Sequence, residues 1–154
     1  MLRKILVPLD GSKLAEKALP YAEALAQKFE AELNLVWVLQ DQTIVAVDYG
    51  SMAIPPIDTM MEQAEQEAST YLTHLQEQFK QQKIPTRVTV LKSHSVADAI
   101  IDLAKKEGSD VIVKTTHGRS GLSRWLFGNV AAKVLQQAPC PVFLVRVSGA
   151  DEDD

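Results

Sequence analysis

Short runs of valine, isoleucine and leucine alternate along this chain with longer segments of helical periodicity, and this alternation constrains the fold more than any other feature. The apolar runs lie at 5–9, 33–39, 87–91, 111–113 and 142–147. Three of them are almost continuously apolar, which is typical of strands that are covered on both faces. Strands that alternate with helices form right-handed crossovers. We therefore predict a Rossmann-like α/β fold with a single open, five-stranded parallel sheet and helices on both faces.

Two helical segments are expected in the first half of the chain. The first follows the N-cap candidate Ser12, carries apolar residues at spacings of three and four as far as Phe29, and should bend at Pro20. The second carries apolar residues from Met60 to Phe79, and we expect its methionines to pack in the core.

Two further helices and one long connection complete the expected order of elements. One helix begins at Ser95, with a capping-box-like Asp98, and ends at Gly108. The last helix is expected over 129–137. The connection at 40–58 is too long for a plain turn, and it is either a functional flap or an ordinary surface loop.

Composition narrows the class of protein. With 154 residues against about 150 per domain, we expect one domain at 1–148 and an acidic flexible tail at 149–154. Sixteen Lys and Arg against twenty Asp and Glu give a net charge of −4, which argues against a nucleic-acid partner. The single cysteine, Cys140, cannot form an internal disulfide, and the first residues contain no signal peptide or membrane span. We expect a cytoplasmic protein with no membrane partner.

The loop after the fourth strand has the strongest features of a ligand site. Ligands of open α/β sheets bind at the carboxyl ends of strands, and the loop after the first strand has neither a dinucleotide-type glycine pattern nor a P-loop. Three of the seven glycines follow the fourth strand closely, namely Gly118, Gly121 and Gly128. Such glycines let backbone N–H groups approach a phosphate, and the helix that begins next offers unpaired amides. The alternative is that these glycines only make turns.

Three side chains near this edge of the sheet have chemistry of interest. Asp10 ends the first strand, where its carboxylate could accept hydrogen bonds from a ribose or a base, or could instead offset the dipole of the first helix. His117 has no evident orienting carboxylate, so we favour a packing or phosphate-facing role over that of a general base. Arg119 adds positive charge. No catalytic residue is assigned, and one cysteine with three scattered histidines predicts no protein metal site.

At these residues the chain resembles the universal stress protein family. The resemblance covers essentially the whole chain and is carried by Ile-Leu-Val-Pro-Leu-Asp-Gly-Ser at 5–12, His-Gly-Arg-Ser-Gly at 117–121 with Gly128, and Ala-Pro-Cys-Pro-Val at 138–142. It implies the strand order 3-2-1-4-5 and a homodimer joined partly through the last strand, from Val142 to Val147. In one branch of the family it also implies ATP bound between strands one and four.

The nucleotide-binding branch has the pattern Gly-x-x-Gly, nine residues, then Gly-Ser or Gly-Thr. This chain has Thr115, Gly118, Gly128 and Asn129 in that register, so the inner glycines match and the outer positions do not. The β-branched Thr115 would take room near the ribose, whereas Asn129 can still cap the helix and offer an amide to phosphate. We expect adenine-nucleotide binding to be retained.

The resemblance also implies roles for individual residues. Asp10 would hold the ribose, and the backbone of Val38 would meet the adenine edge. Lys114 stands where the family usually has an apolar residue, and we expect it to pair with Asp10 before ligand binds. The backbone groups expected to hold phosphates are those of Gly118, Gly128, Asn129 and Val130. The full expected binding set is Pro8, Leu9, Asp10, Val38, Lys114, Thr115, His117, Gly118, Arg119, Gly121, Gly128, Asn129 and Val130.

The leading interpretation is a dimeric stress-response sensor or regulator that binds ATP, or the related ADP or AMP. Any Mg²⁺ or Mn²⁺ would be carried on the phosphates, and hydrolysis would be slow at most. Two alternatives stay open. One is a dimeric interaction module of the same fold that binds no nucleotide, and the other is an ATP-dependent transferase whose substrate-positioning residues the sequence does not name.

Overall fold

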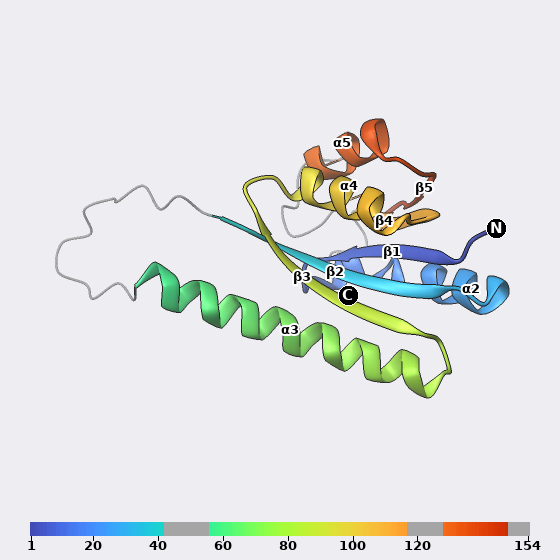
Figure 1. Ribbon diagram of the computed structural model, residues 1–154, viewed down its shortest axis with the longest axis horizontal. Helices are drawn as coiled ribbons and strands as arrows, with labels where there is room; N and C mark the ends of the chain where they lie inside the picture. The colour runs from blue at the N-terminus through green and yellow to red at the C-terminus, as the bar shows by residue number, and fades with distance from the viewer. Residues whose placement is uncertain (42–55, 117–127, 148–154) are drawn as a thin grey trace.

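The sheet has the predicted architecture. The computed structural model describes residues 1–41, 56–116 and 128–147. Its strands are β1 (Lys4–Leu9), β2 (Glu32–Gln40), β3 (Thr86–Ser93), β4 (Val111–Thr115) and β5 (Val142–Val145). All pairs are parallel and the order is β3-β2-β1-β4-β5, which confirms the predicted fold class and strand order (Figure 1).

The last strand is shorter than the predicted run at 142–147. Val145 is the last residue of β5 in register with β4, where it lies opposite Thr115. Beyond it, the Val147 N–H donates to the side-chain oxygen Thr116 Oγ1 at 3.3 Å, and not to a backbone carbonyl of β4, so the regular strand pairing has ended.

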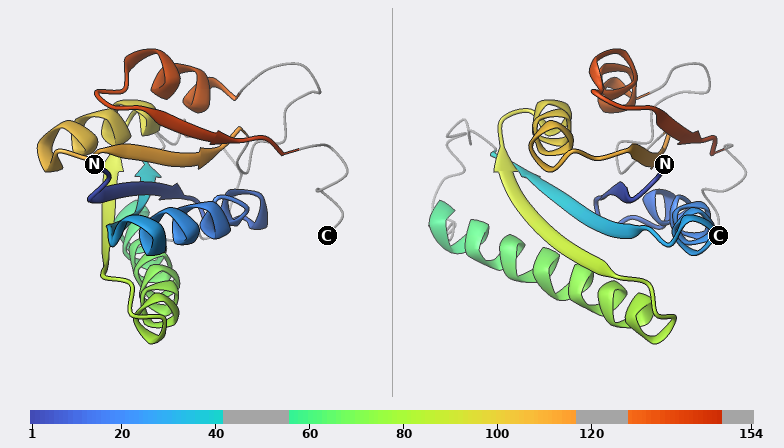
Figure 2. Two further views of the ribbon diagram at one scale, coloured as in Figure 1. Left: turned by 90° about the vertical axis from the view of Figure 1, so that its right-hand side faces the viewer. Right: turned by 45° about the vertical axis from the view of Figure 1, so that its right-hand side comes forward.

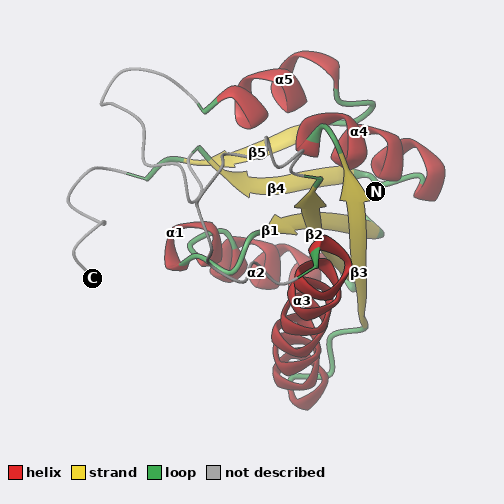
Figure 3. Cartoon of the chain, turned by 90° about the vertical axis from the view of Figure 1, so that its left-hand side faces the viewer, coloured by secondary structure: helices red, strands yellow, loops and turns green. Residues whose placement is uncertain are grey.

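Helices cover both faces of the sheet. α1 (Lys13–Glu16), α2 (Leu19–Phe29) and α3 (Ile57–Gln81) pack on one face, whereas α4 (Val96–Glu107) and α5 (Asn129–Gln137) pack on the other (Figure 2). Figure 3 shows α4 and α5 above the sheet and the long α3 below it. None of the helices in the described ranges is long and apolar enough to cross a membrane.

Side chains of each strand alternate between two hydrophobic cores. In β1, Ile5 and Val7 belong to the core under α2 and α3, whereas Leu6 belongs to the core under α4 and α5. Leu35 and Val36 of β2 divide in the same way, and all five side chains are fully buried. A strand covered on both faces favours an apolar residue at nearly every position, which explains why these runs do not alternate in polarity.

The first helical segment is broken instead of bent, so the prediction of one helix is wrong in this respect. Ser12 is the N-cap of α1, as predicted, because its Oγ accepts the Ala15 N–H at 3.1 Å. α1 ends at Glu16, and α2 starts at Leu19 with Pro20 in its first turn. Proline has no N–H to donate and is therefore tolerated at a helix start, where that donor would lack an intrahelical partner.

The later helices follow the predictions closely. Ser95 caps α4 by accepting the Asp98 N–H at 3.3 Å, and Gly108 ends the helix with a φ of 65°. α5 spans the predicted 129–137. Most of the connection predicted at 40–58 and the acidic tail at 149–154 lie outside the described residues.

Candidate functional site

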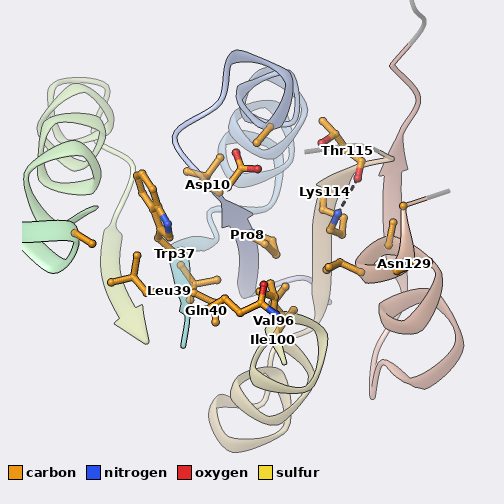
Figure 4. Close-up of a pocket in the computed structure, with 18 of the residues that line it drawn as sticks. Pro8, Asp10, Trp37, Leu39, Gln40, Val96, Ile100, Lys114, Thr115 and Asn129 are labelled. Atoms are coloured by element: carbon orange, nitrogen blue, oxygen red, sulfur yellow. Dashed lines mark hydrogen bonds between the residues drawn. The ribbon is translucent and has the colours of Figure 1, made fainter. Parts of the chain in front are cut away.

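A cavity of about 920 Å³ lies at the carboxyl ends of β1, β2 and β4. Its walls come from both faces of the sheet, with α3 on one side and α4 and α5 on the other (Figure 4). This is the edge at which open α/β sheets bind their ligands.

Nine of the thirteen predicted binding residues line this cavity. They are Pro8, Leu9, Asp10, Val38, Lys114, Thr115, Gly128, Asn129 and Val130. The other four, His117, Gly118, Arg119 and Gly121, lie outside the described residues. Residues that are more than a hundred positions apart in the chain therefore meet at one site.

Asp10 is bonded to the start of α1 and also lines the cavity. Its Oδ1 accepts the Ser12 N–H at 2.9 Å and the Ser12 hydroxyl, which in turn caps α1. These bonds fix the carboxylate at the end of β1, where it lines the cavity beside β4. A carboxylate held in this way can accept hydrogen bonds from ligand hydroxyls.

Lys114 is buried at the end of β4, with an exposed fraction of only 9%. Its ammonium donates to the Thr115 carbonyl oxygen at 2.8 Å (Figure 4). Burial lowers the pKa of Lys114 to about 8, while the charge of Asp10 opposes that change. The predicted pairing with Asp10 therefore takes the form of a charge interaction, and the hydrogen bond goes to the neighbouring carbonyl.

Thr115 and Lys114 both line the cavity, but their side chains project to opposite faces of the sheet. Val113 of β4 faces the core under α2 and α3, and Ile112 faces the core under α4 and α5. Because strand side chains alternate, Thr115 projects to the same face as Val113, whereas Lys114 projects toward α4 and α5. The side chain that enters the α5 half of the cavity is thus that of Lys114.

The start of α5 offers backbone donors to the cavity. Gly128 is the N-cap, so the prediction that Asn129 caps the helix is wrong by one residue. Asn129 and Val130 are the first helical residues, and the first amides of a helix have no intrahelical partner. Gly128, Asn129 and Val130 all line the cavity. Amides in this position, together with the helix dipole, favour an anion.

The α3 side of the cavity was not predicted as part of the site. Trp37, Leu39, Ile57, Met60, Met61 and Ala64 line it. Met61 packs against the core as expected, but Met60 is 45% exposed, so the prediction that both methionines are core residues is only half right. The sequence did not predict Trp37 as a site residue, because it lies inside an apolar run, where a strand residue is expected to be buried in the core.

A chain of contacts braces this wall. The ring of Trp37 meets that of Tyr71 edge-on, with 5.4 Å between centroids. The Tyr71 hydroxyl donates to Glu16 Oε1 at 2.7 Å, and burial raises the pKa of Tyr71, so the phenol stays protonated as a donor. Gly11 also lies close to the Trp37 ring, since a Cβ there would be 2.5 Å from Cη2.

The described residues contain no group of three His, Cys, Asp or Glu side chains placed to hold a metal ion. Cys140 is partly buried, and burial raises the pKa of its thiol, which disfavours the reactive thiolate.

Comparison with known proteins gives a consistent set of relatives. A sequence profile of the Universal stress protein family matches residues 1–146. Universal stress protein YxiE of Bacillus subtilis is 30% identical over 149 residues, which cover 95% of this chain and 100% of that protein. Universal stress protein MJ0577 of Methanocaldococcus jannaschii is 28% identical over 158 aligned positions, which cover 95% of this chain and 96% of that protein.

Solved structures share the fold. The structure of MJ0577 has a TM-score of 0.81 at 23% identity and covers 97% of this chain and 99% of its own. A universal stress protein solved in complex with cAMP has a TM-score of 0.61 at 20% identity, with 96% of this chain and 98% of that chain covered.

Proposed function

Because this chain belongs to the universal stress protein family, we propose that it binds ATP or a related adenine nucleotide and acts as a sensor or regulator in the stress response. The nucleotide would occupy the cavity at the carboxyl ends of β1, β2 and β4. We place this activity in the cytoplasm, in keeping with a chain whose sole cysteine needs no oxidising compartment.

One observation carries the proposal: a fixed carboxylate and a helix N-terminus line the same cavity from either side of β4 (Figure 4). Asp10 provides an acceptor for ribose hydroxyls, and the first amides of α5 provide donors for phosphate. Val38 lies in the wall at the end of β2, where its backbone can meet the edge of the base. The cAMP bound to a structural neighbour supports an adenine nucleotide as the ligand.

Mg²⁺ or Mn²⁺ would enter with the phosphates, since these ions are usually held by substrate phosphates and water. We assign no general base or nucleophile among the cavity residues, so we propose regulation by nucleotide occupancy, with hydrolysis slow at most.

Replacing Asp10 with asparagine should weaken ATP binding by about 10- to 100-fold, the range expected for hydrogen bonds to a charged group. The amide oxygen can still accept from Ser12, so the start of α1 should survive. Isothermal titration calorimetry with ATP, ADP and AMP measures the effect.

Asp41→Asn is the matched control for the change in charge, because Asp41 follows β2 and does not line the cavity. Removal of a negative charge would by itself favour an anionic ligand, so a loss at Asp10 without a loss at Asp41 identifies a specific contact. Equal affinities in all three proteins would contradict the role of Asp10. If the wild-type protein bound none of the three nucleotides, the proposed function would be wrong, and the alternative of an interaction module that binds no nucleotide would replace it.

We also propose a homodimer that uses the edge strand β5. Tyr21 of α2 and Phe143 of β5 lie side by side with 5.5 Å between ring centroids, and they are 50% and 40% exposed. An exposed aromatic pair beside the edge strand of the described sheet is a suitable surface for association.

Phe143→Glu should raise the dimer dissociation constant at least about tenfold, because it places a charge in an apolar contact. Light scattering across a range of protein concentrations measures this change. Phe29→Glu is the control, since Phe29 is similarly exposed but ends α2. A dimer that tolerates Glu at 143 as well as at 29 would exclude this surface.

A further inference from the structure

Lys114 is the one Lys, Arg, Asp or Glu that is buried among the described residues. Burial of an ammonium is unfavourable unless opposite charge or hydrogen bonds compensate for the lost water. The Thr115 carbonyl accepts one hydrogen bond from Nζ, which leaves most of the charge to be balanced by other groups.

The surroundings of Lys114 supply little of that balance. The walls from β2, α4 and α5 that share its cavity are largely apolar, as at Val38, Ile100 and Val130, and the polar Gln40 and Asn129 in them carry no charge. Among the described lining residues, Glu67 of α3 is the one further ionisable side chain. Asp98 of α4 and Lys133 of α5 are partly exposed and pair with each other at 2.8 Å. The carboxylate of Asp10, from β1, is the charge that acts on Lys114, and it does not restore the ordinary pKa.

Lys114 also has a particular place in the cavity. Figure 4 shows it between Asp10 and Asn129, on the strand that separates them. In the proposed binding mode the ribose lies at Asp10 and the phosphates lie at the start of α5. The group between these two points is the phosphate bonded directly to the ribose.

We infer that Lys114 pairs with this first, ribose-linked phosphate, so that the site selects adenosine phosphates over adenosine and gains most of that preference from one phosphate. This inference rests on the proposed function and specifies which phosphate of the nucleotide Lys114 contacts.

Proton uptake should accompany binding. An anion next to the ammonium raises its pKa, whereas in the unliganded protein burial, opposed by the charge of Asp10, holds that pKa at about 8. At pH 8 about half of the unliganded molecules carry a neutral Lys114, so binding of a phosphate should take up about half a proton. At pH 6.5 the lysine is already charged, and little uptake is expected.

The test is calorimetric titration of the full chain with adenosine, AMP, ADP and ATP, without added divalent metal. We expect AMP to bind at least about tenfold more tightly than adenosine at pH 7, and ADP and ATP to lie within about tenfold of AMP. Lys114→Met should weaken AMP at least about tenfold and change adenosine by less than about threefold. Lys114→Arg should keep the preference for AMP.

A second readout separates a phosphate contact from a merely structural effect. Titration of AMP at pH 8 in two buffers with different ionisation enthalpies gives the number of protons bound. The wild-type protein should take up protons, whereas Lys114→Met and Lys114→Arg should not, because methionine does not titrate and arginine stays charged.

The outcomes distinguish the two claims. If the wild-type protein binds adenosine and AMP equally, or if Lys114→Met keeps both the preference and the proton uptake, the inference is wrong while nucleotide binding stands. If none of the four ligands binds the wild-type protein, both the proposed function and the inference fail. Unfolding transitions of both variants establish that they are folded.

Discussion

Replacing Gly11 with alanine is expected to destabilise the protein by about 2–4 kcal/mol, the sum of backbone strain and overpacking. Gly11 has a φ of 80°, in the left-handed region that side chains disfavour. In addition, a Cβ at this position would lie 2.5 Å from Cη2 of Trp37. The ring cannot retreat easily, because Tyr71 packs against it edge-on. Urea unfolding followed by circular dichroism measures the change.

Gly108→Ala separates the two causes. Gly108 has a similar φ of 65°, but a Cβ there would meet no atom within 4 Å. Strain alone should cost about 1 kcal/mol at that site. Equal losses at the two glycines would show that the contact with Trp37 contributes nothing. Because Trp37 lines the cavity, the alanine at 11 should also weaken nucleotide binding, and the alanine at 108 should not.

Lys114→Met is expected to make the unliganded protein about 2 kcal/mol more stable at pH 7, because it removes a buried charge whose compensation is incomplete. A pKa that falls from 10.5 to about 8 on folding corresponds to about 3 kcal/mol. The expected gain is smaller than this figure, since the variant also deprives Asp10 of its neighbouring positive charge.

The sign of the pH dependence follows from the same pKa. Below pH 8 the lysine is charged in both states, and the folded state bears the full cost of burying it. Between pH 8 and 10.5 the unfolded chain binds more protons than the folded one, so the stability of the wild-type protein should rise with pH. The advantage of Lys114→Met should therefore be largest below pH 8 and disappear above about pH 10.5.

Lys133→Met is the matched control for loss of a lysine. Lys133 is partly exposed and pairs with Asp98 at 2.8 Å, so its replacement should change the stability by less than about 1 kcal/mol. A Lys114→Met protein that is no more stable than the wild type at pH 7, or whose advantage does not change with pH, would show that the ammonium is adequately compensated. A gain in stability together with a loss of AMP affinity is the pattern expected of a functional residue that is costly to the fold.

Much of the fold and part of the candidate site could be predicted from local patterns. Ser95 and Gly108 mark the two ends of α4 because caps depend on the chemistry of single residues. The near-continuous apolar runs predicted a doubly covered sheet, because burial on both faces disfavours polar side chains. Asp10, Gly128 and Asn129 could be placed at one edge because the carboxyl ends of parallel strands meet there.

The errors have a common origin. The break between α1 and α2 depends on how Pro20 is accommodated, and periodicity alone does not distinguish a bend from a new helix. Trp37 and Met60 belong to the cavity because of where α3 packs, and their sequence neighbours give no sign of it. Lys114 donates a hydrogen bond to a backbone carbonyl, and a sequence pattern of side chains does not predict such a partner.

The sequence by itself determined the class of fold, the strand order through its family resemblance, and nine of the residues that line the cavity, because periodicity, caps and motifs are properties of neighbouring residues. Only the tertiary structure decided that Trp37 packs against both Gly11 and Tyr71, and that Lys114 is buried near the charge of Asp10 with a lowered pKa. Packing and desolvation are sums over atoms from several elements, so they exist only once those elements have come together.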